Sequence, residues 1–600
     1  MLMSRTHFLL RKAVVALFLI LLPAFLFAQK QITGKVVGKE NQAVNGLTVL
    51  VKGTNRGTST GEDGSFTLMA NPGDVLVVSG VNVAPTEFVV GSNGQVVIDI
   101  QSSSSALAEV VVTALGVKKE TKRLGYSVQE VKGSDLVKAR ESNPVNGLVG
   151  KVSGLDVAIS KEMLAAPAVS LRGGNITLYV VDGIPITSDT WNISPDDIET
   201  YTVLKGLAAT ALYGSRAQNG AILITTKRGK RNAKGYSIEY NTSFQVDDGF
   251  IAVPQTQALY GPGERNQYRF GDGKGGGLND GDYDVWGPKF AGQLLPQYDS
   301  PIDPATGIRT STPWIARGAN NMENFIQAGQ LWTNNLSFST ATDRASIRMS
   351  LSHSHQKGIV PNTKLDISNF NVNATYDLSS RLKVEAGLNY NKQYTPNIPD
   401  VNYGPNSLIY SLSVWTGADY DVNELKNYWQ PGKEGIQSIF AEYQRYQNPW
   451  FMSYEWLRGH YKTDVVGNAG LSYRLNDNWD LQLRTNVTTY DVLRTEKLPY
   501  SAHPYGREEN KGDYREDRRS LFDNNVEGLV KYHGQLTKGI GLEALAGGNA
   551  RNFTYNSSFT TTDYLNVPGL YNFQNSMNPV KAYSYNSKMF VLSAYYSVNL

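Results

Sequence analysis

The feature that most constrains the fold of this chain is a two-residue alternation of apolar and polar side chains in residues 231–600. Residues 236–241 read Tyr-Ser-Ile-Glu-Tyr-Asn, and the same alternation recurs at 370–378, 382–390 and 479–487. A period of two places one class of side chain on each face of a β-strand. Strands of about 9–11 residues, as predicted here, are long enough to cross a lipid bilayer.

The connections between these strands alternate between tight turns and long loops. Tight turns are predicted at 342–344, 379–381, 476–478 and 537–539, and long loops at about 247–333, 354–368, 393–463, 491–520 and 552–587. A soluble β-sandwich gives the same alternation in any one hairpin. Turns strictly interleaved with loops favour an antiparallel transmembrane β-barrel, which has short connections on one side only.

About ten strands are predicted up to the chain end, the last from Lys588 to Leu600. A barrel with a plugged lumen needs about 22 strands. We therefore expect the sequence to be the N-terminal portion of a longer chain. The alternative is that the domain preceding the strands lies outside the barrel.

Composition excludes several classes of protein. The 57 Lys and Arg residues nearly balance 54 Asp and Glu residues, so no nucleic-acid partner is expected. The absence of Cys excludes disulfides, thiolate metal sites and an N-terminal lipoprotein anchor. A mean hydropathy of −0.32 excludes a polytopic helical membrane protein.

The N-terminus reads as a signal peptide over residues 1–28. Arg5, Arg11 and Lys12 precede an apolar run over residues 13–28, and Ala28 is a plausible cleavage position. We therefore expect an exported protein.

Three further regions precede the alternating strands. Residues 29–102 carry short β-branched runs at the spacing of a small sandwich of about seven strands. Residues 103–116 hold a polar linker followed by a β-branched segment. Residues 117–230 form a mixed α+β domain, with strands predicted at 178–181 and 221–226 and helix-compatible segments at 196–205 and 208–213. The predicted fold class is thus mainly β, with one α+β domain.

Several segments resemble the SusC/RagA-type TonB-linked outer-membrane transporters, in the family's order along the whole chain. Residues 49–54 (Val-Leu-Val-Lys-Gly-Thr) resemble the carboxypeptidase-regulatory-like domain, and residues 107–116 resemble the TonB-box segment. Residues 178–185 and the long stretch 203–227 resemble the motifs of the plug domain. One departure is the short spacing between Leu171-Arg172-Gly173-Gly174 and Leu178, which implies a shortened plug loop.

The resemblance implies a set of site residues. The TonB-binding segment is Glu109, Val110, Val111, Val112, Thr113 and Ala114. The plug-motif residues are Arg172, Gly173, Asp182, Gly183, Lys205, Gly206, Tyr213, Gly214, Arg216 and Gly220. A β-branched segment on a flexible tether can pair with the edge of a partner's sheet, which suits the first set. The alternative is that Val110–Thr113 is merely the first strand of the plug.

The resemblance also implies a function. It predicts import of oligosaccharides across the outer membrane, in partnership with TonB and its inner-membrane motor and with a SusD-like surface lipoprotein, in a dimer of transporter–lipoprotein pairs. Import of oligopeptides, as in the RagA branch, is one alternative, and a non-transporting surface adhesin or structural barrel is another. No enzymatic activity, cofactor or metal is expected.

Aromatic residues crowd the long loop 393–463. Tyr428, Trp429, Tyr446, Trp450 and Trp456 are the candidate substrate contacts, because aromatic faces cover the apolar faces of sugars and of peptide side chains. Packing and membrane-interface roles are alternatives.

Other patterns carry little chemistry. The 57–61 match to a nucleophile elbow lacks the strand-to-helix context, and the Gly-rich run 271–276 lacks a βαβ unit. Residues 279–284 lack the distal Glu of a Ca²⁺ loop. His353 and His355 share a strand face without an apparent third metal ligand. Residues 507–519 alternate in charge and read as a solvated loop.

Overall fold

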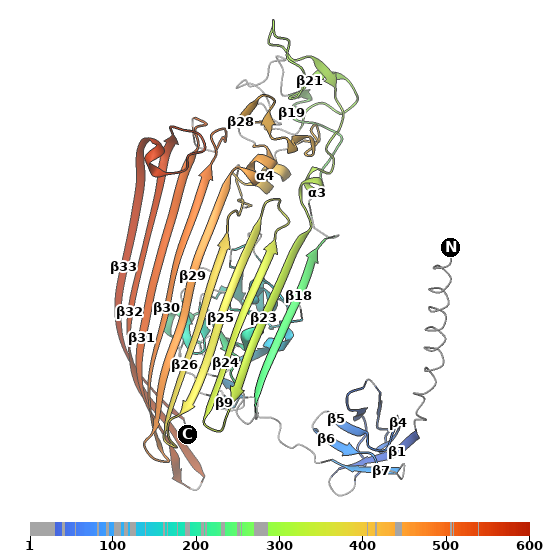
Figure 1. Cartoon of the computed structure of the whole chain (residues 1–600), viewed down its shortest axis with the longest axis vertical. Coiled ribbons are helices and arrows are strands. Elements are labelled where there is room, and N and C mark those ends of the chain that lie inside the picture. Colours follow the sequence, from blue (N-terminus) through green and yellow to red (C-terminus); the bar gives the residue numbers. More distant parts are fainter. Residues whose placement is uncertain are drawn as a thin grey trace, which may run out of the picture. The chain divides into compact units, whose positions relative to one another are not determined.

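The computed structural model describes residues 30–599 (Figure 1). Within that range it omits 39–41, 55, 81–82, 92–94, 101–109, 113–117, 121–127, 139, 160–162, 165, 177, 187–192, 206–208, 211–212, 230–234, 249–252, 254, 269–285, 402, 405, 415–416, 439–446, 505–506, 508 and 538. The predicted signal peptide lies outside the described residues. The chain divides into two compact units, the first holding residues 1–111 and 119–124 and the second residues 112–118 and 125–600.

The first unit is a two-sheet sandwich, as predicted. Its strands are β1 (Lys30–Val37), β2 (Thr48–Val51), β3 (Gly57–Ser59), β4 (Ser65–Ala70), β5 (Val75–Gly80), β6 (Val83–Val89) and β7 (Gln95–Asp99). The sheet orders are β4-β1-β7 and β3-β2-β5-β6. Alternate residues such as Phe66, Leu68 and Ala70 of β4 are buried in a shared apolar core.

Residues 128–226 of the second unit form an α+β domain, here called the plug. Its strands are β10 (Val128–Lys132), β11 (Leu155–Ala158), β12 (Ala168–Leu171), β13 (Gly174–Asn175), β14 (Tyr179–Val181), β15 (Ile184–Ile186), β16 (Ile198–Leu204) and β17 (Ala221–Thr226). Short 3-10 helices are η5 (Gly133–Asp135), η6 (Pro144–Leu148), η7 (Pro195–Asp197) and η8 (Gly214–Ala217). The main sheet has the order β10-β16-β17-β14-β15, and β11-β12-β13 form a second sheet.

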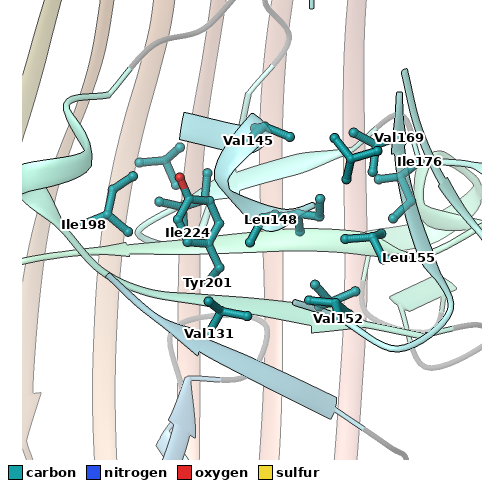
Figure 2. Packing of buried hydrophobic residues seen from close by; sticks show 14 of the residues in the cluster. Val131, Val145, Leu148, Val152, Leu155, Val169, Ile176, Ile198, Tyr201 and Ile224 are labelled. Carbon is teal, nitrogen blue, oxygen red and sulfur yellow. The ribbon is translucent and has the colours of Figure 1, made fainter. Parts of the chain in front are cut away.

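The plug core lies on the central strands, where Val131, Leu148, Ile198, Tyr201 and Ile224 pack together (Figure 2). The helix expected over 196–205 is wrong. After η7 this segment is the central strand β16, paired on both sides with β10 and β17. The β-branched residues of the Thr-Tyr-Thr-Val run and the ladder bonds on both edges outweigh the weak helical pattern.

The remaining long strands form one antiparallel sheet of ten strands, as counted from the sequence. They are β18 (Tyr236–Asp247), β23 (Gly329–Ala341), β24 (Ala345–Lys357), β25 (Lys364–Asp377), β26 (Leu382–Thr395), β29 (Leu457–Arg474), β30 (Trp479–Leu498), β31 (Asp513–Thr537), β32 (Ile540–Leu565) and β33 (Ser576–Asn599), side by side in that order (Figure 1). All four predicted tight turns lie between consecutive strands.

The strands are longer than expected, reaching 26 residues in β32. The loops expected over 491–520 and 552–587 shrink to 499–512 and 566–575. Residues 513–519, expected in a solvated loop, begin β31. Here charged side chains pair across the ladder, with Arg515 Nη1 2.8 Å from Glu496 Oε2 of β30. Ion pairs and ladder hydrogen bonds thus continue the sheet where apolar alternation stops.

The two faces of this sheet differ in the sense opposite to that of a water-soluble protein. The face toward the plug is polar and buried, as at Arg348, Ser350, Asn371 and Asn391. The other face carries exposed apolar side chains, namely Ile238, Phe244, Leu336, Leu351, Tyr376, Leu388, Leu471, Leu483, Phe522, Val526, Val530, Phe590 and Leu592. An apolar outer face and a polar inner face are the pattern of a barrel wall in lipid.

The long loops carry their own structure. They contain β19 (Gly263–Glu264), β20 (Gln267–Tyr268), β21 (Leu294–Pro296), β22 (Ser311–Pro313), α3 (Asn321–Phe325), α4 (Leu408–Ser413), η9 (Glu424–Lys426), β27 (Trp429–Gln430), β28 (Lys433–Gln437), α5 (Pro449–Tyr454) and η10 (Phe573–Asn575). Among the residues described here, no helix has the length and apolar character needed to cross a membrane.

Candidate functional site

The plug is attached to the polar face of the ten-stranded sheet through a buried charge pair. Asp197 ends η7 and is fully buried, and Arg348 on β24 is 5% exposed. Arg348 Nη1 lies 2.8 Å from Asp197 Oδ1, and Ser350 Oγ donates to the same oxygen at 2.5 Å. Burial raises the pKa of the Asp197 carboxyl, against the opposing effect of Arg348 and Ser350. The pair therefore holds two charges out of water at one contact between the plug and the ten-stranded sheet, here called the wall.

A second contact connects a plug-motif residue to the wall through one hydroxyl. The carboxylate of Asp182 accepts from the backbone N of Thr226 at 2.9 Å and from its Oγ1 at 2.6 Å. Asn373 on β25 donates from Nδ2 to the same Oγ1 at 2.9 Å and to the carbonyl of Lys227 at 3.2 Å. The turn at Asp182 and the wall are thus joined through Thr226 at the end of β17.

Two predicted glycine positions have backbones that favour glycine. Asp182 and Gly183 have φ of 48° and 87° in the tight turn between β14 and β15. Gly220 has φ of 114°, and a Cβ there would lie 2.7 Å from the carbonyl oxygen of Leu204. The motif at these positions therefore shapes the backbone of the plug.

The other plug-motif residues lie at turns and on the plug surface. Arg172 and Gly173, with φ of 52° and 84°, form the turn between β12 and β13, and Gly214 begins η8. Lys205 Nζ donates to the carbonyl of Ser153 at 2.9 Å. Tyr213 packs beside the buried residues of β14, β16 and β17. Gly206 lies outside the described residues.

Arg216 lies near the opposite part of the wall. Its pKa is lowered by burial and by the positive charge of Arg551 on β32, whereas Asp523 on β31 raises it. Asp523 is itself paired with Arg551 at 2.6 Å. The plug therefore presents a cation to a wall position that already holds a complete ion pair.

The predicted TonB-binding segment is only partly described. Val110–Val112 form the short strand β8, which pairs with β9 (Lys118–Glu120). Glu109, Thr113 and Ala114 lie outside the described residues. Binding of TonB by this segment stays a prediction.

The candidate loop aromatics pack with one another. Trp456 is 3% exposed, and Tyr428, Trp429 and Trp450 pack against an apolar cluster that includes Phe451. Tyr428 and Trp429 have ring centroids 5.0 Å apart, and Trp450 Nε1 donates to the carbonyl of Val422 at 2.7 Å. Tyr446 lies outside the described residues. The role of these residues in substrate binding stays a prediction, and the contacts described are internal to the loop cluster.

Sequence reasoning did not single out Arg348, Ser350 and Asn373. The signal was the alternate polar positions of β24 and β25, but a polar face does not name the residue opposite it. His355 Nδ1 lies 2.7 Å from Asp366 Oδ1 across the strand pair. Among the described residues no group of three or more His, Asp or Glu side chains is arranged to hold a metal ion.

Comparison with known proteins matches both N-terminal domains. Residues 120–221 match the TonB-dependent receptor plug domain, and residues 32–112 match the CarboxypepD_reg-like domain. The chain is 36% identical over 284 residues to the TonB-dependent receptor SusC of Bacteroides thetaiotaomicron, covering 44% of this chain and 27% of that protein. These matches support assignment of the chain to the SusC/RagA type of TonB-dependent receptors.

A further relative and a solved structure are also similar to the chain. TonB-dependent receptor P26 of Formosa agariphila is 30% identical over 369 residues, covering 60% of this chain and 34% of that protein. The structure of the RagAB peptide importer in the closed-closed state has the same fold, with a TM-score of 0.60 at 18% identity, covering 79% of this chain and 53% of that one. The chain thus spans about a third or less of the curated relatives and about half of that solved chain.

Proposed function

We propose that this chain supplies the plug and the N-terminal part of the barrel of a TonB-dependent importer in the outer membrane of a Gram-negative bacterium. The observation that carries the proposal is the ten-stranded sheet with an apolar outer face, whose polar inner face holds the plug through Asp197 and Arg348. An adhesin has no need for a plug that can be released.

The outer face supports placement in lipid. On β29 the outward side chains between Val465 and Tyr473 are Val, Gly, Ala, Leu and Tyr, a length within the span of about 9–11 residues expected for a crossing strand. Near the tight turns this apolar belt ends in aromatic residues, where Trp479 and Tyr532 have ring centroids 5.0 Å apart. Amphipathic rings prefer that depth in the membrane. Export would follow signal-peptide cleavage near Ala28.

The proposed mechanism uses the plug contacts as the element that moves. Ligand binding on the long-loop side exposes residues 109–114, TonB pairs with that segment, and force passes along the chain into the plug. The plug–wall bonds of Asp197 and Thr226 are among those that must break for a path to open. Their partners on the ten-stranded sheet are the polar side chains of Arg348, Ser350 and Asn373, so that separation leaves groups that water can solvate.

We propose oligosaccharides as the substrate class, with a SusD-like surface lipoprotein as the partner and a dimer of transporter–lipoprotein pairs as the assembly. The sequence similarity to SusC supports this choice. Oligopeptide import is the second candidate, and the observation that favours it is the shared fold with the RagAB peptide importer.

Deletion of residues 109–114 in the full-length transporter tests the proposal. Uptake of labelled oligosaccharide and oligopeptide pools by whole cells is expected to fall to background, with surface binding retained. The matched control deletes residues 101–106, a polar stretch of equal length. Equal uptake by both deletion variants would refute TonB-dependent import. If the control variant takes up only one of the two pools, that pool identifies the substrate class.

A further inference from the structure

A groove of about 950 Å³ crosses the outer face of the sheet from β25 to β33. The alternation of side chains along each strand shows which face of the sheet carries the groove. Asn373 of β25 points to the plug, so Asp366 and Ser368 of the same strand point away from it. Cross-strand pairing carries this orientation to 14 of the 19 lining residues, whereas Gln393, Lys462, Val492, Arg519 and Ser557 occupy the intervening positions, and no described residue of the plug lines the groove.

Two rows of side chains flank the groove, one residue pair per strand. The row nearer the long loops is Asp366, Tyr394, Tyr461, Leu493, Arg518, Ser558 and Ser584. The row nearer the tight turns is Ser368, Lys392, Thr463, Asp491, Ser520, Asn556 and Asn586. The second row is polar throughout. A polar line across seven neighbouring strands marks a change of environment.

The apolar belt begins immediately beside this second row. The next outward residues toward the tight turns are Phe370, Tyr390, Val465 and Phe522, with Thr489, Thr554 and Lys588 at the other three positions of that row. Phe522 is 45% exposed, and Leu351 of β24 in the same row is 58% exposed. The groove therefore lies at the border where apolar surface gives way to polar surface.

Opposite charges are spread along the groove. Arg518 contacts Glu516 at 2.8 Å but stays 61% exposed, and Asp366 is held by His355. Within the described part of the chain, Lys392 and Asp491 have no ion pair. Thr463 lies between them on the intervening strand, so their backbones are about 10 Å apart, which is two strand spacings. A ligand with separate anionic and hydroxyl groups matches this spacing.

We propose that the groove binds the phosphorylated saccharide headgroup of a glycolipid in the membrane leaflet on the long-loop side. Lys392 and Arg518 contact phosphate, Asp491, Ser520 and Asn556 bond to sugar hydroxyls, and the acyl chains cover the apolar belt next to the groove. The exposed apolar side chains beside the groove argue for a lipid, because a soluble saccharide phosphate would leave them uncovered. This inference rests on the membrane placement in the proposed function.

The test uses the full-length transporter in phosphatidylcholine nanodiscs that contain lipopolysaccharide as the phosphorylated glycolipid probe. Retained glycolipid is counted by native mass spectrometry after detergent exchange. Lys392→Ser/Arg518→Ser is expected to lower retention about 30-fold, given the usual contribution of each of two basic residues to binding of anionic lipid. The matched control is Lys357→Ser/Lys364→Ser, which removes two cations from β25 and its neighbour β24, outside the groove lining.

Each outcome decides something. Loss of retention in the groove variant but not in the control supports the proposal. Equal retention in wild type and groove variant overturns it, as does displacement of the glycolipid by its soluble, deacylated headgroup at equal concentration. A transporter that does not enter the nanodiscs refutes the membrane placement itself. Normal insertion without selective retention refutes only the groove.

Discussion

The guanidinium of Arg348 lies 2.8 Å from the carboxylate of Asp197, and these two buried residues come from the wall and from the plug respectively. Removing a charge from water is costly, and mutual attraction offsets the cost only while both partners are present. The pair therefore fixes the position of the plug on the ten-stranded sheet. A plug displaced by even one residue would leave each charge buried alone.

Asp197→Ala is expected to weaken docking of the plug by about 3–5 kcal/mol, because it leaves Arg348 buried without its partner. Hydrogen exchange of the β16 and β17 amides in the full-length protein measures the effect. The double variant Asp197→Ala/Arg348→Ala should recover part of the loss. A control, Asp196→Ala, breaks the ion pair with Arg140 inside the plug and should loosen plug amides without altering protection of β24. Unchanged exchange in Asp197→Ala would contradict this account.

Substitution of two glycines of the plug motif distinguishes the cost of backbone strain from the cost of steric conflict. Gly214 and Gly220 both have positive φ, but a Cβ at Gly214 meets nothing within 4 Å whereas one at Gly220 meets the carbonyl oxygen of Leu204. Gly214→Ala should cost about 1–2 kcal/mol of plug stability, the usual penalty of left-handed backbone. Gly220→Ala should cost more, because strand β17 must shift. Thermal unfolding, monitored by the resistance of the plug to protease, compares the two variants. Equal loss of plug stability would show that the contact with Leu204 relaxes freely.

Much of this architecture could be predicted from the sequence. The alternation in residues 236–246 fixed a strand because every second side chain had the same character, and the Asn476–Asn478 turn joins β29 to β30 as expected. The sandwich and the strand over 221–226 were equally readable. Local period and turn chemistry suffice where each residue's partner is solvent, lipid or a neighbour in the ladder.

The failures have a shared cause, which is that the deciding partner is distant in sequence. Residues 513–519 alternate Arg with Glu and Asp, a pattern that reads as solvated until Arg515 meets Glu496 across β30. Residues 198–204 become a strand only because β10 and β17 lie on either side. The plug–wall pair joins positions 197 and 348, and neither residue has a local pattern that names the other.

His503 provides a pH-dependent test of the loop cluster. Burial lowers the pKa of its imidazole to about 4. The backbone N of His503 donates to Gln447 Oε1 at 3.0 Å, and Gln447 Nε2 donates to the carbonyl of His503 at 2.8 Å. Because the unfolded imidazole titrates near about 6.5, the unfolded state binds more protons between that pH and about 4. Stability is thus complete above this window and falls as the pH drops through it.

The expected result is lower hydrogen-exchange protection at Gln437 and Asn448, whose amides belong to the same network, on acidification from neutral pH toward pH of about 4, once each rate is divided into the intrinsic rate at that pH. His503→Gln should remove this acid sensitivity while keeping a hydrogen-bonding side chain. Acid sensitivity of equal size in the variant would assign it to another group.

The apolar belt can be tested on a single strand. Ala550 and Thr560 of β32 are an even number of residues apart, so both side chains point away from the plug, but Ala550 lies within the belt and Thr560 lies beyond the polar rows. Ala550→Arg is expected to cost about 2–4 kcal/mol of folding free energy in lipid, and Thr560→Arg about 0–1 kcal/mol, because the penalty for a buried cation depends on its depth in the bilayer. Folding of the full-length protein into vesicles over a urea series gives both values. If Ala550→Arg proved as harmless as Thr560→Arg, the face opposite the plug would be in contact with water, and the barrel assignment would lose its physical basis.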